Sequence, residues 1–292
     1  MNNNSAIPGK FVCIALLILL IAAAFAGCTG SSAASPAETA TPAAAPAVTV
    51  AATAAPTGES ILVFCGAGLK APMQEIGAAY KEKTGVDVQF NYGGAGTLVS
   101  QMNLTRKGDV FMPGSTNEWK TAKAQGLVGE YQLVAYHVPA IAVQKGNPKQ
   151  IATIKDFARP GLKVALGDVN ATAIGKAGAK IFKKFNITAD VEKNVVTRTP
   201  TINELVTLMN AGQADAAIMT LDSINTEKME VITIPISDNE VLITPIGPTT
   251  YTKNSEAAAK FAAYVASDEG KAFFAKHGFP VYPDPAYANV QP

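Results

Sequence analysis

Loops with almost no side chains follow several predicted strands of this 292-residue chain, and each loop leads into a predicted helix. In NYGGAGTLVSQM, residues 94–96 lie between an alternating apolar run and a helix-like segment. Equivalent positions are occupied by residues 66–68, 113–115 and 168–172, and by the residues around Ile202. A helix N-terminus presents unpaired N–H groups and a partial positive charge, and small residues let an anion approach them. The pattern predicts an anion site built from main-chain amides.

Two other interpretations of the same glycines compete with the anion site. A glycine often does no more than shape a tight strand-to-helix turn. Residues 66–71 also fit the dinucleotide pattern G-x-G-x-x-A, but the next strand ends at Asn91, where that pattern needs an acidic residue for the ribose. The chain has neither the GxxxxGK[ST] of nucleotide-binding loops nor the GxSxG of hydrolases. Repetition of bare loops in both halves of the chain favours the anion.

The elements that must position these loops alternate as strand and helix. Strands are predicted at 61–65, 86–92, 108–114, 138–146, 162–168, 215–221 and 231–236. Helices are predicted at 71–85, 97–104, 116–127, 173–185, 201–212 and 254–278, the last with a break near Ser267. This order is typical of an α/β fold with parallel strands, whose carboxyl ends meet at one edge and bind ligands there. The chain contains two such α/β groups.

An export signal is predicted over residues 1–28. Lys10 precedes a long apolar run, and the residues FAGC at 25–28 resemble the lipid-attachment motif of exported lipoproteins. Residues 29–58 are almost all Ala, Thr, Pro and Ser, which predicts a flexible tether. An ordinary signal peptide and an uncleaved N-terminal anchor are the alternatives. We expect a soluble domain held by lipidated Cys28 at the outer face of the cytoplasmic membrane.

Charge and cysteine content argue against several classes of protein. The 24 Lys and Arg nearly balance the 23 Asp and Glu, so no broad basic face for nucleic acid is expected. Outside the signal Cys65 stands alone, which argues against an internal disulfide or a Cys/His zinc site. His137 and His277 show no ligand spacing, and we expect both to be structural or exposed. We expect no cofactor, no free metal ion and no catalysis.

Taken together and in order, the motifs resemble the molybdate- and tungstate-binding proteins of ABC importers, which are type II periplasmic binding proteins. The resemblance covers residues 59–282 and rests on VFCGAGLKAPMQEI, FNYGGAGTLVSQM, GDVFMPGS, GDVNATAIGKAG and TINELVTLMNAGQADAAI. It implies two Rossmann-like α/β lobes with a ligand cleft between them, one formed by 59–137 plus 246–292 and the other by 138–245. It also implies a monomer that captures a tetrahedral oxyanion and delivers it to an ABC permease.

At the positions where the family contacts its ligand, this chain retains the main-chain amides but lacks two of the family's side-chain hydroxyls. The family's loop serines fall at Gly68 and Ala95, and its late-strand tyrosine falls at Thr220. Hydroxyl groups that could replace the missing ones are expected from Thr97, Ser115, Thr172 or Thr220. A carboxylate contact is expected from Asp168 or Asp222. Each of these residues has an alternative role as a cap or turn residue. The predicted ligand-binding set is Gly66, Ala67, Gly68, Gly94, Ala95, Gly96, Thr97, Ser115, Asp168, Thr172, Ala173, Ile174, Ile202, Thr220 and Asp222.

Rival functions remain open from the sequence. Another oxyanion, such as phosphate or sulfate, suits the same scaffold, although protonated phosphate needs a hydrogen-bond acceptor. A sensor or adhesion module would use the tether for display. An enzyme would need a base and a nucleophile at the cleft, and Cys65 is the residue to test for that role.

Overall fold

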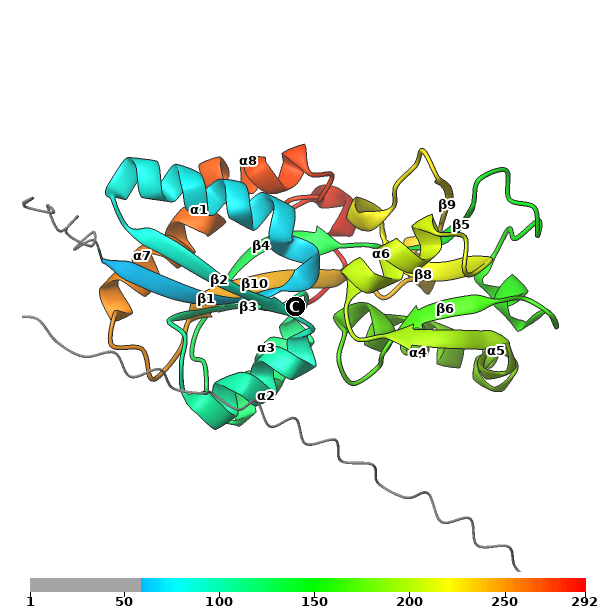
Figure 1. Cartoon of the computed structure of the whole chain (residues 1–292), viewed down its shortest axis with the longest axis horizontal. Coiled ribbons are helices and arrows are strands. Elements are labelled where there is room, and N and C mark those ends of the chain that lie inside the picture. The colour runs from blue at the N-terminus through cyan, green and yellow to red at the C-terminus, as the bar shows by residue number, and fades with distance from the viewer. Residues whose placement is uncertain (1–58) are drawn as a thin grey trace, which may run out of the picture. The chain divides into compact units, whose positions relative to one another are not determined.

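The computed structural model describes residues 59–292, which form two five-stranded sheets with helices on their faces (Figure 1). The strand orders are β2-β1-β3-β10-β4 in the first sheet and β7-β6-β8-β5-β9 in the second. Each sheet with its helices makes one lobe, which confirms the predicted two-lobed α/β fold. The predicted export signal, the tether and Cys28 lie outside the described residues.

The first lobe packs helices on both faces of its sheet (Figure 1). Its strands are β1 (Ser60–Gly66), β2 (Asp87–Gly93), β3 (Val110–Met112), β4 (Gln132–His137) and β10 (Leu242–Pro248). One face carries α1 (Lys70–Thr84), α7 (Ser255–Ala266) and α8 (Asp268–Lys276), and the other carries α2 (Ala95–Thr105) and α3 (Thr116–Ala124). Between α7 and α8 the Ser267 side chain accepts a hydrogen bond from the Gly270 amide and caps α8, so the predicted helix break at this serine is confirmed.

The second lobe repeats the plan with one continuous apolar core. Its strands are β5 (Pro139–Gln144), β6 (Val164–Gly167), β7 (Val195–Thr199), β8 (Ala216–Thr220) and β9 (Met229–Thr233). Helices α4 (Ala173–Lys184) and α5 (Thr188–Asn194) lie on one side and α6 (Ile202–Asn210) on the other (Figure 1). Short 3₁₀ turns are η1 (Ala67–Leu69), η2 (Ile154–Ala158), η3 (Leu221–Ser223), η4 (Ile236–Asp238) and η5 (Pro285–Tyr287).

Antiparallel strands carry the chain between the lobes, and here the structure differs from the expected parallel sheets. Strand β10 is antiparallel to β3 and β4, and β5 is antiparallel to β8 and β9. Neither β4 nor β10 is predicted from the sequence. Proline weakens the strand signal of LITPIGP, and the sheet accommodates Pro245 at a register shift. Strand β10 begins at Leu242, ahead of the expected return to the first lobe at 246.

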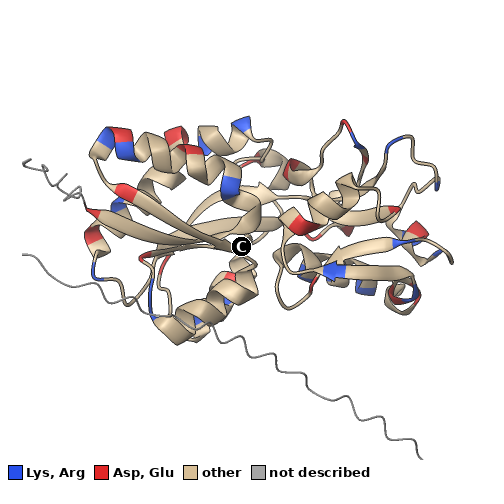
Figure 2. Ribbon diagram, viewed as in Figure 1, with Lys and Arg blue, Asp and Glu red and all other residues tan. Residues whose placement is uncertain are grey.

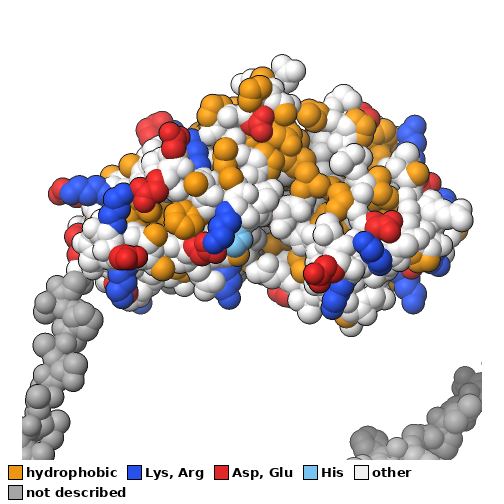
Figure 3. Space-filling view, turned by 90° about the horizontal axis from the view of Figure 1, so that it is seen from above, with side chains coloured by type: hydrophobic (Ala, Val, Ile, Leu, Met, Phe, Trp, Pro, Cys, Tyr) orange, Lys and Arg blue, Asp and Glu red, His pale blue; other side chains and the backbone are white. Residues whose placement is uncertain are grey.

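Charged side chains are scattered over the outer helices and loops of both lobes (Figure 2). On the face seen in Figure 3, charges of both signs lie among apolar groups. Exposed pairs such as Lys81–Asp87 contribute little to stability. Two pairs differ because their acidic side chains are only 2% exposed: His137–Asp222 and Lys176–Glu118. Both belong to the region between the lobes.

Candidate functional site

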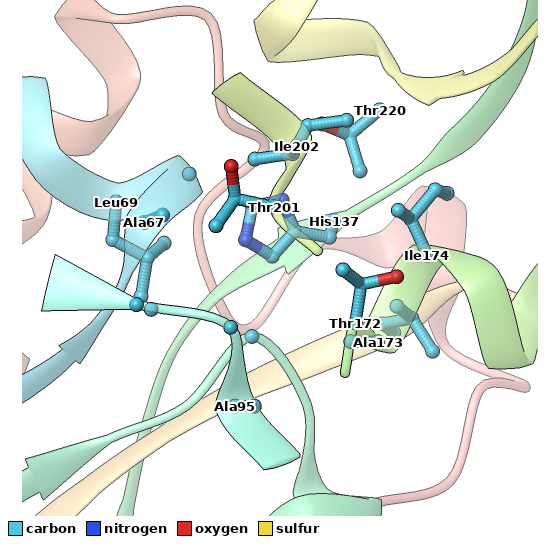
Figure 4. Close-up of a pocket in the computed structure, with 16 residues that line it drawn as sticks. Ala67, Leu69, Ala95, His137, Thr172, Ala173, Ile174, Thr201, Ile202 and Thr220 are labelled. Atoms are coloured by element: carbon cyan, nitrogen blue, oxygen red, sulfur yellow. The ribbon is translucent and has the colours of Figure 1, made fainter. Parts of the chain in front are cut away.

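A cavity of about 50 Å³ lies between the lobes, at the carboxyl ends of the parallel strands (Figure 4). Its lining comes from both sheets and from the helices that follow their strands. The lining residues are Gly66, Ala67, Gly68, Leu69, Gly93, Gly94, Ala95, Gly114, His137, Thr172, Ala173, Ile174, Thr201, Ile202, Thr220 and Leu242.

The predicted ligand-binding set divides into two groups on this lining. Residues that line the cavity are Gly66, Ala67, Gly68, Gly94, Ala95, Thr172, Ala173, Ile174, Ile202 and Thr220. Residues that do not line it are Gly96, Thr97, Ser115, Asp168 and Asp222. Lining residues absent from the predicted set are Leu69, Gly93, Gly114, His137, Thr201 and Leu242. The bare strand-to-helix loops signalled Gly114 and Thr201, whereas no sequence motif marked His137.

Three helices begin at residues that line the cavity. Helix α2 begins at Ala95, α4 at Ala173 and α6 at Ile202, and each of these residues lines the cavity. First-turn amides have no acceptor within their own helix, and the N-terminus carries the positive end of the helix dipole. The 3₁₀ turn η1, which precedes α1, adds Ala67 and Gly68. The arrangement suits a ligand that accepts hydrogen bonds and carries negative charge.

Threonine side chains cap two of these helices, α4 and α6, and do not bond to the outermost amides. The Thr172 hydroxyl accepts from the Gly175 amide at 3.0 Å, and the Thr201 hydroxyl accepts from the Glu204 amide at 3.2 Å. Each cap satisfies an amide in the third position of its helix. The amides of Ala173 and Ile202 therefore stay available at the cavity.

The hydroxyl protons proposed as ligand donors are mostly engaged within the protein. Ser115 donates to the Glu118 carboxylate, and Thr172 donates to the main-chain oxygen of Asp168 at 2.9 Å. Thr220 donates to Asp222 Oδ2 at 3.0 Å. These three hydroxyls act as capping or bridging groups, so the amides carry most of the donor capacity at the cavity.

Gly94 and Gly96 bring the two lobes into contact. A Cβ atom on Gly94 would lie 2.5 Å from the carbonyl oxygen of Pro200, and one on Gly96 would lie 2.1 Å from that of Asn170. The Gly96 amide donates to the carbonyl oxygen of Ala171 at 3.1 Å. Both glycines are thus required for close approach of main chains, and the Gly96 amide is already occupied.

Neither candidate carboxylate lines the cavity. Asp168 Oδ1 accepts from the amides of Asn170 and Ala171 at 2.8 and 2.9 Å, which shapes the loop before α4. Asp222 Oδ1 lies 3.2 Å from His137 Nδ1, and its side chain is 2% exposed. The ring of His137 therefore separates Asp222 from the cavity. His137 itself is buried, as expected of a structural histidine, but it also lines the cavity.

Neither a metal site nor a thiol nucleophile is supported by the described part of the chain. In residues 59–292, no three His, Cys, Asp or Glu side chains are grouped closely enough to hold a metal ion. Burial raises the pKa of the Cys65 thiol well above its usual range, so the nucleophilic thiolate is disfavoured. Cys65 is fully buried and does not line the cavity.

Comparisons with known proteins agree on fold and family. The model of the bacterial extracellular solute-binding protein family matches residues 61–280. A molybdate-binding protein, ModA, from Mycobacterium tuberculosis is 28% identical over 224 residues, which cover 75% of this chain and 84% of the relative. A sulfate-binding protein from Synechococcus elongatus is 26% identical over 254 residues, covering 72% and 69% of the two chains.

A solved structure shows the same fold. The periplasmic molybdate-binding protein of Azotobacter vinelandii superposes with a TM-score of 0.65 at 16% identity, over 77% of this chain and all of its own. Among residues 59–292, no helix has the length and apolar character needed to span a membrane. The resemblance predicted from the motifs is confirmed at the level of the family: the chain is a member of the bacterial extracellular solute-binding proteins.

Proposed function

We propose that this protein captures a tetrahedral oxyanion, molybdate or tungstate, and delivers it to an ABC importer. One observation carries the proposal. The first residues of helices in both lobes line a small cavity, and among residues 59–292 no Lys, Arg, Asp or Glu belongs to its lining. Such a site attracts a dianion through helix termini and hydrogen bonds rather than through an ion pair.

The size of the cavity supports a small inorganic ion. Its volume of about 50 Å³ corresponds to about four water-sized positions. Pockets for drug-sized organic ligands hold about 300–1,000 Å³. The available space suits a ligand with four oxygens around one central atom better than a larger organic ligand.

Main-chain donors are sufficient for tight binding. A hydrogen bond to a charged group contributes about 1.5–3 kcal/mol, so about five of them supply roughly 8–15 kcal/mol before ordering costs. Micromolar to nanomolar dissociation constants need about 8–12 kcal/mol. The amides of Ala95, Ala173 and Ile202, with those of η1, provide donors of this number and kind.

Among residues 59–292 the lining contains no carboxylate, and its ionisable side chain, His137, accepts a hydrogen bond only while its ring is neutral, so a protonated ring favours an anion without a proton. Molybdate, tungstate and sulfate only accept hydrogen bonds at neutral pH, whereas hydrogen phosphate also donates one and needs an acceptor. Relatives named for molybdate and for sulfate are both present, so sulfate is the second candidate. We place molybdate and tungstate first because the order of the loop motifs resembles that branch of the family.

Calorimetric titration of the whole protein tests the proposal. Molybdate and tungstate should bind with micromolar or lower dissociation constants, sulfate more weakly, and hydrogen phosphate most weakly of the four. Chloride at matched ionic strength serves as the control for nonspecific charge effects. Heats indistinguishable from dilution for all four oxyanions would contradict the proposed function.

We further propose that lipid on Cys28 and the tether over 29–58 hold the binding domain near its permease. The proposed lobes are 59–137 plus 246–292 and 138–245, and the proposed binding unit is a monomer. Mass spectrometry of the native N-terminus should show a diacylglyceryl group on Cys28. An intact Met1 or an unmodified Cys28 would contradict the anchor.

A further inference from the structure

Among residues 59–292, His137 is the one ionisable side chain that lines the cavity. It ends β4, directly before the chain passes into the second lobe at Pro139. Only 5% of the residue is exposed, and the edge of its ring packs against Phe279 with ring centroids 5.1 Å apart. In Figure 4 the ring lies between Thr201 and Thr172, at the centre of the lining.

One nitrogen of the ring is held by a buried carboxylate. His137 Nδ1 lies 3.2 Å from Asp222 Oδ1, and the other oxygen of Asp222 accepts the Thr220 hydroxyl at 3.0 Å. A carboxylate accepts hydrogen bonds and donates none while ionised. The proton on Nδ1 is therefore fixed in place, and the remaining nitrogen, Nε2, is the position that gains or loses a proton.

The second nitrogen is on the cavity side of the ring. A Cβ atom on Gly114 would lie 3.8 Å from His137 Nε2, and one on Gly68 would lie 3.7 Å from Cε1. Both glycines line the cavity. Within residues 59–292 no side chain or main-chain group forms a hydrogen bond with Nε2. The ring thus presents an unpartnered nitrogen beside the space that a ligand would occupy.

We propose that His137 is an ionisable ligand contact, protonated on both nitrogens when the anion is bound, so that the protein takes up a proton as it binds a dianion. This inference rests on the proposed function. A neutral ring with its proton on Nδ1 turns a lone pair toward the cavity and repels an oxyanion oxygen. A protonated ring donates from Nε2 and adds a positive charge between Asp222 and the ligand.

Asp222 is the charged side chain that contacts the ring in the described part of the chain. Contacts from β10, η1, the loop after β3 and the segment after α8 come from groups that do not titrate. These neighbours are Leu242, Gly68, Gly114 and Phe279. The protonation of His137 is therefore governed by Asp222 and by the ligand.

The sign of the pH dependence follows from this arrangement. A dianion binds the protonated ring more tightly than the neutral ring. The affinity for molybdate should therefore fall as the pH rises and the ring loses the proton on Nε2. Because one proton is taken up, the fall in affinity is at most about tenfold per pH unit.

Calorimetry of the whole protein with molybdate tests the inference without any mutation. Titrations between about pH 6 and 9 in buffers of different ionisation enthalpy measure the number of protons taken up. Uptake that approaches one proton near the middle of this range, with a falling affinity, is the expected result. Tight binding with no proton uptake and a flat pH profile would overturn the role of His137 and leave the proposed function standing. An absence of binding at every pH would overturn the proposed function.

Three variants separate a titrating contact from a structural one. His137→Gln keeps a polar side chain but cannot titrate, so the pH dependence and the proton uptake should both disappear. Asp222→Asn removes the carboxylate that stabilises the charged ring and should shift the fall in affinity to lower pH. His277→Gln is the matched control, because His277 pairs with Glu75 at 3.0 Å away from the cavity and should not alter the profile. A pH profile of His137→Gln that keeps the wild-type slope would overturn the inference.

Discussion

Gly94 and Gly96 lie where main-chain atoms of the two lobes approach each other closely. Their missing side chains leave room for the carbonyl oxygens of Pro200, Asn170 and Ala171. An open loop for an anion and a close contact between lobes both require glycine. Gly94 also lines the cavity, so this residue links ligand capture to the approach of the lobes.

Replacement of Gly96 by alanine should weaken ligand binding without unfolding the protein. The added Cβ would lie 2.1 Å from the Asn170 carbonyl oxygen, and overpacking of this kind costs about 1–3 kcal/mol, or about 5- to 150-fold in affinity. Because Gly96 lies in α2, alanine favours the helix itself and should keep the melting temperature of the ligand-free protein. Gly129→Ala is the control, since a Cβ there meets no atom within 4 Å. Unchanged molybdate affinity in Gly96→Ala would show that close contact of the lobes is not needed.

Single residues of the site were predictable to different degrees. Bare loops between a strand and a helix are visible in the sequence, and they include residues such as Gly68 and Ala173, which line one cavity in the structure. His137 was not marked, because its role depends on Asp222, which lies 85 positions along the chain. A pairing made by tertiary structure between distant residues leaves no local pattern.

At the scale of elements, a threonine side chain caps the N-terminus of α4 and another caps that of α6. Thr172 satisfies the Gly175 amide and also donates to the Asp168 carbonyl oxygen, which fixes the start of α4 against the loop before it. The first residues of α4, Ala173 and Ile174, then line the cavity. Cap and ligand use different amides of the same turn, so helix stability and binding are coupled.

Thr172→Ala should destabilise the protein and weaken binding together. Loss of an N-cap threonine costs about 0.5–2 kcal/mol. In a domain of this size each kcal/mol lowers the melting temperature by about 2–4 °C. Thr172→Ser keeps the capping oxygen and should restore both stability and molybdate affinity. Urea unfolding and calorimetry measure the two effects, and full stability in Thr172→Ala would contradict the capping role.

Strand prediction failed where the chain passes between lobes. The sequence indicated α/β alternation, the helix break at Ser267 and most of the parallel strands, because apolar periodicity and caps are local signals. Strands β4 and β10 were not predicted from the sequence. Strand β10 contains Pro245 and Pro248, which weaken the strand signal, and β4 is followed almost directly by β5. Their pairing partners lie far away in sequence, so only the assembled sheet identifies them.

At the scale of the whole domain, polar contacts hold the lobes together around the cavity. Lys176 Nζ on α4 lies 2.8 Å from Glu118 Oε1 on α3, and Asn203 Nδ2 on α6 donates to the Ala67 carbonyl oxygen at 3.0 Å. Glu118 is 2% exposed, and in residues 59–292 its side-chain partners are Ser115 and Lys176. Separation of the lobes would leave this carboxylate with Ser115 alone, so the pair favours the closed arrangement.

Lys176→Gln should therefore lower ligand affinity although Lys176 does not line the cavity. A hydrogen bond to a charged group contributes about 1.5–3 kcal/mol, and because the Lys176 side chain is 36% exposed we expect the lower end, about a tenfold loss. Small-angle scattering should show a larger radius of gyration for the variant at subsaturating molybdate. Lys193→Gln is the matched control, because Lys193 pairs with Asp190 within α5 at the surface. Equal affinity and equal radius of gyration in Lys176→Gln and Lys193→Gln would mean that the buried pair does not bias closure, and binding would then depend on the amides and His137 alone.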